Sequence, residues 1–191
     1  MKAILQRVLS ASVAVEKEVV SSIGKGVLVF AAVAPGDTEK EADSLAAKVL
    51  KMKLWDDETG GRWKKSVTEI SGEVLCVSQF TLLASTKKGN KPDFHGAMGG
   101  EEASRLYQYF FEKVQTGYAA ERVKNGVFQA MMEVALVNDG PVCLGIHYIL
   151  PLALVDVLTR FYKVTLELSV GGQRPAAEPA AKKKAPAEPT E

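Results

Sequence analysis

Hydrophobic residues in the first third of the chain recur in patterns that are typical of β-strands. The run Val27–Val33 is continuously apolar and has the length of a strand buried on both faces. The polar turn Glu16–Glu18 separates two short strand-like runs and therefore predicts a hairpin. The predicted strands are Ala3–Leu9, Ser12–Val15, Val19–Ile23 and Val27–Val33, followed by Glu73–Phe80, Phe128–Val137 and Val164–Leu168.

Two segments have the period of an amphipathic helix. Thr38 and Glu41 have the spacing of a capping box, and apolar residues then recur on one face as far as Leu50. Glu101–Thr116 predicts a second helix with an aromatic and aliphatic stripe. Strands and two main helices in one domain predict an α/β fold with mixed β-sheet layers.

Composition narrows the class of protein. The 191 residues are 47% apolar and 25% charged, which is normal for one globular domain with an appendage. A formal net charge of +1 excludes a chain that binds nucleic acid through overall positive charge. Any RNA binding must come from a local patch, for which Lys64 and Lys65, or Lys87, Lys88 and Lys91, are candidates; solvated loop lysines are the alternative.

The same composition predicts no metal and no cofactor. The two cysteines form no CxxC pair, His95 and His147 are far apart, and there is no Gly-rich phosphate loop. Free thiols without a secretory signal favour a cytoplasmic location. The apolar segment Cys143–Lys163 is too short and too broken for a membrane span, so we expect no membrane association.

Two short motifs are candidates for chemistry. Ser78–Leu82 places polar side chains at the end of a buried strand, where a rigid element can present them; a strand end that simply becomes polar is the alternative. Asn138–Pro141 has the composition of a turn that closes a strand. Its alternative use is backbone recognition, because Gly lets a ligand approach the main chain and an X-Pro bond can be cis.

Together these motifs resemble the D-aminoacyl-tRNA deacylase family. The resemblance covers residues 1–142 in order, and the Ser78–Leu82 and Asn138–Pro141 motifs are specific in combination. It also includes Met1–Val8, Ala11–Val13, Lys88–Phe94 and Gly126–Met131. The resemblance implies a D-aminoacyl-tRNA deacylase-like fold, without metal or cofactor, and a homodimer with active sites at the interface.

The resemblance also implies a reaction and a set of site residues. The enzyme would hydrolyse the ester of D-aminoacyl-tRNA, and of glycyl-tRNA mischarged on tRNA-Ala. Gly140-Pro141, in a cis peptide, would enter the partner's pocket and reject L-amino acids sterically. Arg7 would help to fix this motif across the interface. Phe128 and Met132 would pack near the terminal adenine, with core packing as the alternative. The implied catalytic residues are Ser78, Gln79, Phe80 and Thr81, and the implied substrate-binding residues are Arg7, Phe128, Met132, Asn138, Gly140 and Pro141.

The identity of the nucleophile stays open at this stage. Thr81 is a candidate, because Thr can form acyl intermediates when a base activates it, but no base stands beside it in sequence. The alternative is assistance from the terminal ribose 2′-OH, with backbone N–H groups stabilising the oxyanion.

The chain departs from the family pattern after Pro141. Residues 142–163, which are 22 residues, are apolar without a clear period, and Val164–Leu168 resembles the expected continuation of the deacylase domain, 1–168. We interpret 142–163 as an atypical insertion, either a retained intron or an additional loop near the tRNA. Residues 169–191 predict a disordered Ala/Pro/Lys/Glu tail. A non-catalytic nucleic-acid-binding dimer, or an inactive paralogue caused by the insertion, are the alternative functions.

Overall fold

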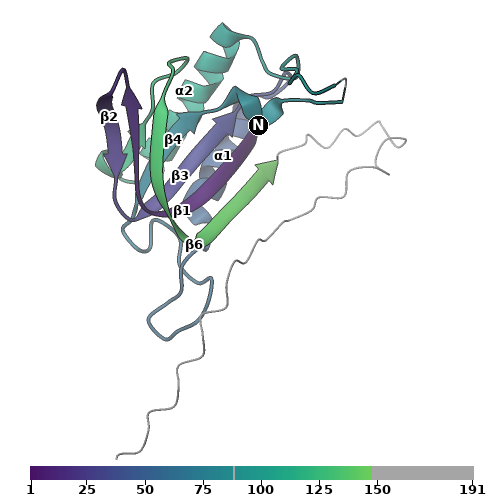
Figure 1. The fold of residues 1–191 in the computed structure, drawn as a ribbon. Helices are drawn as coiled ribbons and strands as arrows, with labels where there is room; N and C mark the ends of the chain where they lie inside the picture. Colours follow the sequence, from purple (N-terminus) through teal and green to yellow (C-terminus); the bar gives the residue numbers. More distant parts are fainter. Residues whose placement is uncertain (88, 148–191) are drawn as a thin grey trace, which may run out of the picture.

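A computed structural model describes residues 1–87 and 89–147 of the chain. Its strands form one sheet in the order β2-β1-β3-β4-β5, with β6 paired to the free side of β1 (Figure 1). The strands are β1 (Lys2–Val15), β2 (Glu18–Ile23), β3 (Gly26–Ala32), β4 (Glu73–Ser78), β5 (Val123–Asn125) and β6 (Glu133–His147). The helices are α1 (Glu39–Lys51) and α2 (Gly100–Thr116), with short 3-10 helices η1 (Phe80–Leu83) and η2 (Ala120–Arg122).

Strand direction follows from the connections. β1 pairs antiparallel with β3, β2 and β6, and the β1–β2 connection is a tight turn in which Glu16 and Lys17 have positive φ. β3, β4 and β5 run parallel, because the connection after β3 contains α1 and the one after β4 contains α2. Parallel strands bring their carboxyl ends to one edge, and this edge positions the site described below.

The two helices cover one face of the sheet and form the main core (Figure 1). The predicted capping box at the start of α1 is present: Glu41 accepts from the Thr38 backbone N–H at 2.8 Å, and the Thr38 hydroxyl in turn caps the first turn. Leu45 of α1 and Phe110 of α2 are fully buried against the sheet. Each buried side chain of this size contributes about 1.5–3 kcal/mol of burial free energy.

A second apolar cluster occupies the other face. Val8 and Val13 of β1 and Leu28 of β3 are fully buried there, and Val134 and Leu136 of β6 pack over them. The sheet therefore curls until it is nearly barrel-like. The predicted α/β architecture, with mixed sheet layers and two main helices, is confirmed.

β1 is longer than the sequence predicts. Ala3–Leu9 and Ser12–Val15 belong to a single strand, because register shifts near Val8 and between Val13 and Ala14 bend β1 without ending it. β5 was not predicted, because three residues are too few to show a period.

The prediction that Asn138–Pro141 is a turn that closes the strand Phe128–Val137 is wrong. β6 continues through this motif to His147, and Val142–His147 pairs with Arg7–Lys2 of β1. Burial alternates along this stretch: Val142, Leu144 and Ile146 point inward, and the residues between them are exposed. The sequence reading missed this two-residue period because Cys143 and Gly145 occupy the outward positions without being strongly polar.

Part of the predicted insertion is therefore strand. The remainder of the insertion, 148–163, together with the predicted strand Val164–Leu168 and the tail 169–191, lies outside the described residues. The insertion hypothesis stays a prediction. Within residues 1–87 and 89–147, no helix is long and apolar enough to cross a bilayer.

Candidate active site

A cavity of about 470 Å³ opens where β3 and β4 end, between the sheet and α2. Crevices outside the carboxyl ends of parallel strands are the usual binding places in α/β folds. Three stretches supply most of its wall: Ala31–Val33 at the end of β3, Val77–Thr81 at the end of β4, and Phe128–Met132 before β6. Among the ten site residues predicted above, the cavity brings together Ser78, Gln79, Phe80, Thr81, Phe128 and Met132.

Backbone hydrogen bonds fix the Ser78–Thr81 wall. The Gln79 N–H donates to the Ala31 carbonyl at 2.8 Å, which extends the β3–β4 ladder by one residue. η1 then turns the chain across the cavity mouth, and the Lys2 ammonium donates to the Leu82 carbonyl at 2.7 Å. The prediction that Phe80 ends a strand is wrong, because Phe80 begins η1 and its side chain is 56% exposed.

Thr81 has a defined hydrogen-bond partner. The Gln79 side-chain amide donates to the Thr81 hydroxyl oxygen across 2.5 Å. A hydroxyl that accepts from an amide keeps its own proton available for donation, and an amide cannot remove that proton. This arrangement suits a hydrogen-bond donor better than an activated nucleophile.

The cavity supplies neutral groups. Among the residues that line it, Tyr107 is the one with a titratable side chain. Burial raises the pKa of Tyr107 well above its usual value of 10, and its hydroxyl donates to Asn125 at 2.7 Å. Tyr107 is therefore protonated at neutral pH and cannot act as a base. In the described part of the chain no His, Cys, Asp and Glu side chains group as metal ligands.

Phe128 and Met132 lie on an irregular segment. The Phe128 ring packs against Tyr107 with centroids 5.6 Å apart, and the Met132 sulfur accepts from the Val127 N–H at 3.4 Å. The predicted strand Phe128–Val137 therefore starts too early: Gln129 has a φ of +62°, and β6 begins at Glu133. The turn folds both side chains into the cavity wall.

The remaining predicted residues form a second cluster. The Arg7 guanidinium donates through Nε to the Asp139 backbone carbonyl at 3.2 Å and through Nη1 to the Leu54 carbonyl at 2.6 Å. Its Nε also forms an ion pair with the Asp139 carboxylate at 3.1 Å. The Asn138 amide donates to the carbonyls of Arg7, at 2.6 Å, and Val142, at 3.1 Å, where the β1–β6 register shifts. The bond Gly140-Pro141 is cis, and both residues are exposed.

Arg7 supports Gly140 directly. Gly140 has a φ of +118°, and a Cβ there would stand 3.0 Å from Arg7 Nη2. The Trp63 ring lies over the Arg7 guanidinium at 6.0 Å, although its own φ of +57° is unusual for a bulky residue. Leu54 and Trp63 could not be predicted as partners of Arg7, because they come from a segment far from it in sequence.

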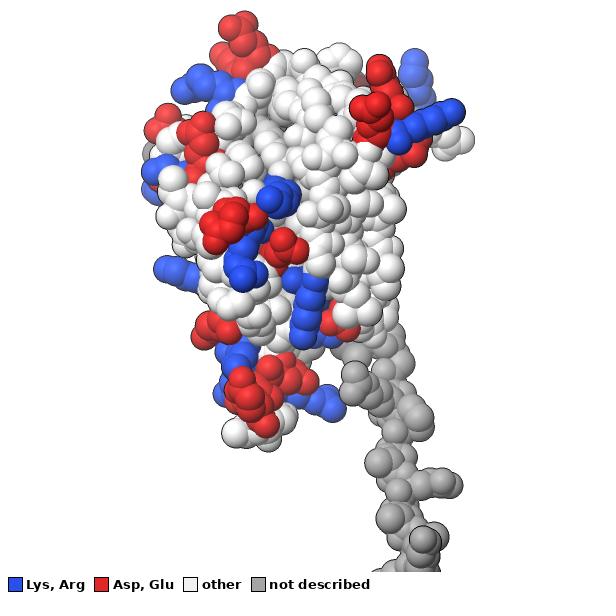
Figure 2. Space-filling model, turned by 90° about the vertical axis from the view of Figure 1, so that its left-hand side faces the viewer, with Lys and Arg blue, Asp and Glu red and all other residues white. Residues whose placement is uncertain are grey.

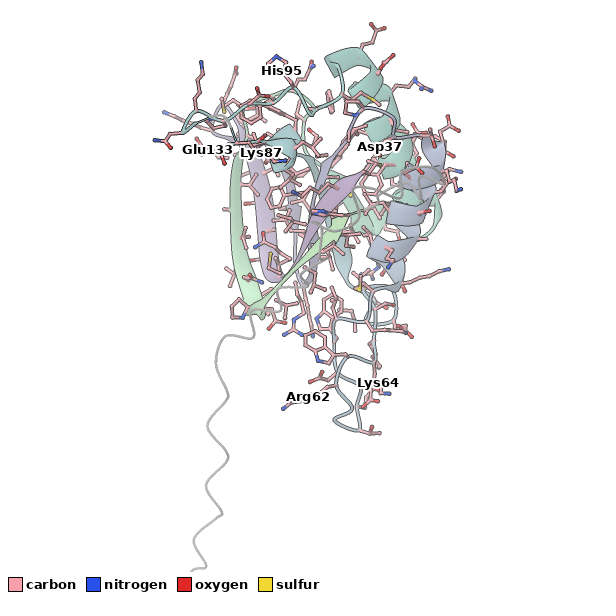
Figure 3. All side chains as sticks on the ribbon, turned by 90° about the vertical axis from the view of Figure 1, so that its right-hand side faces the viewer. Asp37, Arg62, Lys64, Lys87, His95 and Glu133 are labelled. Atoms are coloured by element: carbon pink, nitrogen blue, oxygen red, sulfur yellow. The ribbon has the colours of Figure 1, made fainter. Side chains whose placement is uncertain are left out.

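The cavity cluster and the Arg7 cluster lie at opposite ends of the same molecule. Val134 lines the cavity, and Gly140 follows six residues later on β6. At about 3.3 Å per residue the separation is about 20 Å. In Figure 3, Lys87, His95 and Glu133 mark the cavity end, and Arg62 and Lys64 mark the opposite end. Gly140-Pro141 cannot reach the cavity of its own chain.

Comparisons with known proteins place the chain in a family. Residues 4–147 match the family model described as D-Tyr-tRNA(Tyr) deacylase. A D-aminoacyl-tRNA deacylase of Yarrowia lipolytica is 50% identical over 144 residues, which cover 74% of this chain and 94% of that relative.

Two solved structures have the same fold. A c-Myc DNA unwinding element binding protein superimposes with a TM-score of 0.74 at 44% identity, covering 78% of this chain and 99% of the other. A probable eukaryotic D-amino acid tRNA deacylase superimposes with a TM-score of 0.64 at 17% identity, covering 76% and 97%. The chain belongs to the D-aminoacyl-tRNA deacylase family, as its motifs predict. The roles of the ten site residues stay predictions.

Proposed function

We propose that this chain hydrolyses the ester that joins a D-amino acid to the 3′ end of tRNA, releasing the free amino acid and tRNA. Glycyl-tRNA mischarged on tRNA-Ala is the second proposed substrate. The observation that carries the proposal is the wall Ser78–Thr81, a polar edge on a mainly apolar cavity, in a chain that matches the family over residues 4–147. Aminoacyl-tRNAs are used in the cytoplasm, where we place the protein.

The cavity chemistry favours stabilisation over acid–base catalysis. Water adds to the ester carbonyl, the acyl C–O bond breaks, and the ribose oxygen takes a proton. Phe80 and Thr81 are the first residues of η1, and the first backbone N–H groups of a helix have no acceptor within it. We assign them to the developing oxyanion, with the terminal ribose 2′-OH assisting the water.

Phe128 and Met132 have a supporting role in this proposal. Both are partly buried in the cavity wall, where the flat Phe128 ring and the polarisable Met132 sulfur offer an apolar surface. We assign this surface to the terminal adenine.

We further propose that rejection of L-amino acids requires a second copy of the chain. In a two-fold dimer, Gly140-Pro141 of one protomer enters the cavity of the other. Three observations support this: the separation of the two clusters by about 20 Å, the exposure of Gly140 and Pro141, and exposed apolar side chains on neighbouring strands. These exposed apolar side chains are Leu9, Val19, Val20 and Val137. Figure 2 shows mixed charges on one side of this face and a largely uncharged area beside them.

The proposal is tested by incubating the purified chain with D-tyrosyl-tRNA and L-tyrosyl-tRNA in parallel. We expect rapid release of D-tyrosine and little release of L-tyrosine. Glycyl-tRNA-Ala is a third substrate in the same assay. Equal rates with the D- and L-esters would defeat the proposal of stereoselective hydrolysis.

A nucleic-acid-binding function without catalysis is the second candidate. The observation that favours it is the 44% identity to a structure named as a c-Myc DNA unwinding element binding protein. Binding to duplex DNA that persists at moderate salt, together with no hydrolysis of either ester, would support this candidate.

A further inference from the structure

Residues 85–87 and 89–97 form a rim beside the cavity mouth. The Phe94 ring of this segment packs against Phe80 of the cavity wall, with centroids 5.1 Å apart and planes at 69°. Neither ring is buried by the contact: Phe80 is 56% exposed and Phe94 is 37% exposed. Two large apolar rings presented side by side at the mouth of a cavity are typical of a binding surface.

The backbone holds this rim in a defined shape. Ser85 and Asp93 exchange two backbone hydrogen bonds, of 2.8 and 2.9 Å, which close the loop between them. The Ala97 N–H donates to the Phe94 carbonyl at 2.9 Å, and the Met98 N–H donates to the Val33 carbonyl at 3.1 Å. Because Val33 itself lines the cavity, Phe94 is fixed relative to the cavity.

The rim carries net positive charge. The described residues of the rim include two lysines, Lys87 and Lys91, and one aspartate, Asp93. The carboxylate of Asp93 accepts from the His95 backbone N–H at 2.8 Å and contacts the His95 ring at 2.8 Å, so its charge is engaged locally. Lys91 is exposed. Figure 3 shows Lys87 and His95 at this end of the molecule.

We propose that the rim binds the unpaired nucleotides that precede the terminal adenosine of the tRNA, with the Phe94 ring as a stacking surface for a base. The inference rests on the proposed function, which places the aminoacylated adenosine in the cavity. The chain of nucleotides must then leave the cavity across its edge. Exposed aromatic rings beside lysines are the usual means of holding single-stranded RNA without reading its sequence.

The test measures binding directly, so that it does not depend on hydrolysis. A fluorescently labelled trinucleotide with the sequence of the tRNA 3′ end, cytidylyl-cytidylyl-adenosine, is titrated with the protein, and adenosine is the competitor. We expect the trinucleotide to bind about tenfold more tightly than adenosine, since one stacked base commonly contributes this much.

Two matched variants isolate the ring. Phe94→Leu keeps apolar contact with Phe80 but has no π-face. It should therefore remove most of the difference in affinity between trinucleotide and adenosine, while the affinity for adenosine stays the same. Phe94→Tyr keeps the ring and should retain this difference in affinity. Lys91→Gln should reduce the slope of the logarithm of trinucleotide affinity against the logarithm of salt concentration by about 0.7. Lys40→Gln, at an exposed position of α1, is the control for this variant.

The outcomes separate the two proposals. If wild-type protein binds trinucleotide and adenosine equally, or binds neither, the rim inference is overturned even when D-tyrosyl-tRNA is hydrolysed. Retention of the full advantage in Phe94→Leu would also overturn it. Failure to hydrolyse D-tyrosyl-tRNA, with the trinucleotide advantage intact, would overturn the proposed function and leave the rim standing.

Discussion

At the scale of single residues, Arg7 has the most demanding position. Its guanidinium simultaneously contacts Asp139, Leu54 and the Trp63 ring, and it lies behind Gly140. A planar fork with several fixed donors makes these contacts, whereas a lysine ammonium cannot make them together. We therefore predict that Arg7→Lys lowers kcat/KM for D-tyrosyl-tRNA by about 100-fold, because small misplacements of a recognition motif are costly. Unchanged kinetics in a folded Arg7→Lys variant would contradict this role.

For Thr81 we predict that substitution has only a small effect on hydrolysis. Its oxygen accepts from the Gln79 amide, and no side chain that could act as a base lines this cavity among the described residues. We expect Thr81→Ala to retain single-turnover hydrolysis to within about tenfold, which is the scale of one lost hydrogen bond. Thr81→Ser is the matched control. Complete loss of single-turnover hydrolysis in Thr81→Ala, with activity retained in Thr81→Ser, would restore Thr81 as the nucleophile.

The pH dependence of hydrolysis tests the neutral character of the cavity. Burial raises the pKa of Tyr107 well above 10, so this hydroxyl stays protonated through the neutral range. We expect the pH–rate profile between about pH 6 and 9 to show no inflection that belongs to Tyr107. An inflection in that range that disappears in Tyr107→Phe would show that Tyr107 titrates during the reaction.

At the scale of elements, β6 shows where sequence reasoning succeeds and fails. Helix α1 was predictable from its capping box and apolar face, because both signals are local. The continuation of β6 past Pro141 depends on pairing with β1, more than 130 residues away in sequence, as in Arg7↔Val142. Phe128 and Met132 line the same cavity as Ser78–Thr81. Only the family resemblance predicted this, because the spacing of these residues in the sequence does not show that they lie close together.

The same strand allows a test of the insertion. Val142, Leu144 and Ile146 fill the inward positions after Pro141. Removal of residues 142–163 would place Val164–Leu168 after Pro141, and its residues Val164, Leu166 and Leu168 have the same spacing. We predict that this deletion changes the thermal midpoint by less than about 4 °C, because the core loses little apolar surface. A much larger fall would show that 142–163 is required for folding.

At the scale of the whole molecule, the proposed dimer makes each active site a product of two chains. Ala130→Trp would fill the cavity, and Gly140→Val would place a side chain on a residue with a φ of +118°. Each variant alone should be inactive. In a mixed dimer, one site joins an intact cavity to an intact Gly140-Pro141. Mixing equal amounts after subunit exchange should therefore restore about a quarter of wild-type activity. No recovery in mixtures that contain mixed dimers would contradict the cross-subunit site.

The fold, the cavity and family membership converge on one central claim, which is stereoselective hydrolysis of aminoacyl-tRNA. The most direct measurement is the rate of tyrosine release from D-tyrosyl-tRNA and L-tyrosyl-tRNA by the purified chain under identical conditions. The predicted result is a D-ester rate at least about 100-fold above the L-ester rate, as expected when a side chain is excluded sterically. Equal rates for the two esters, or no release above the uncatalysed rate from the D-ester, would contradict the claim.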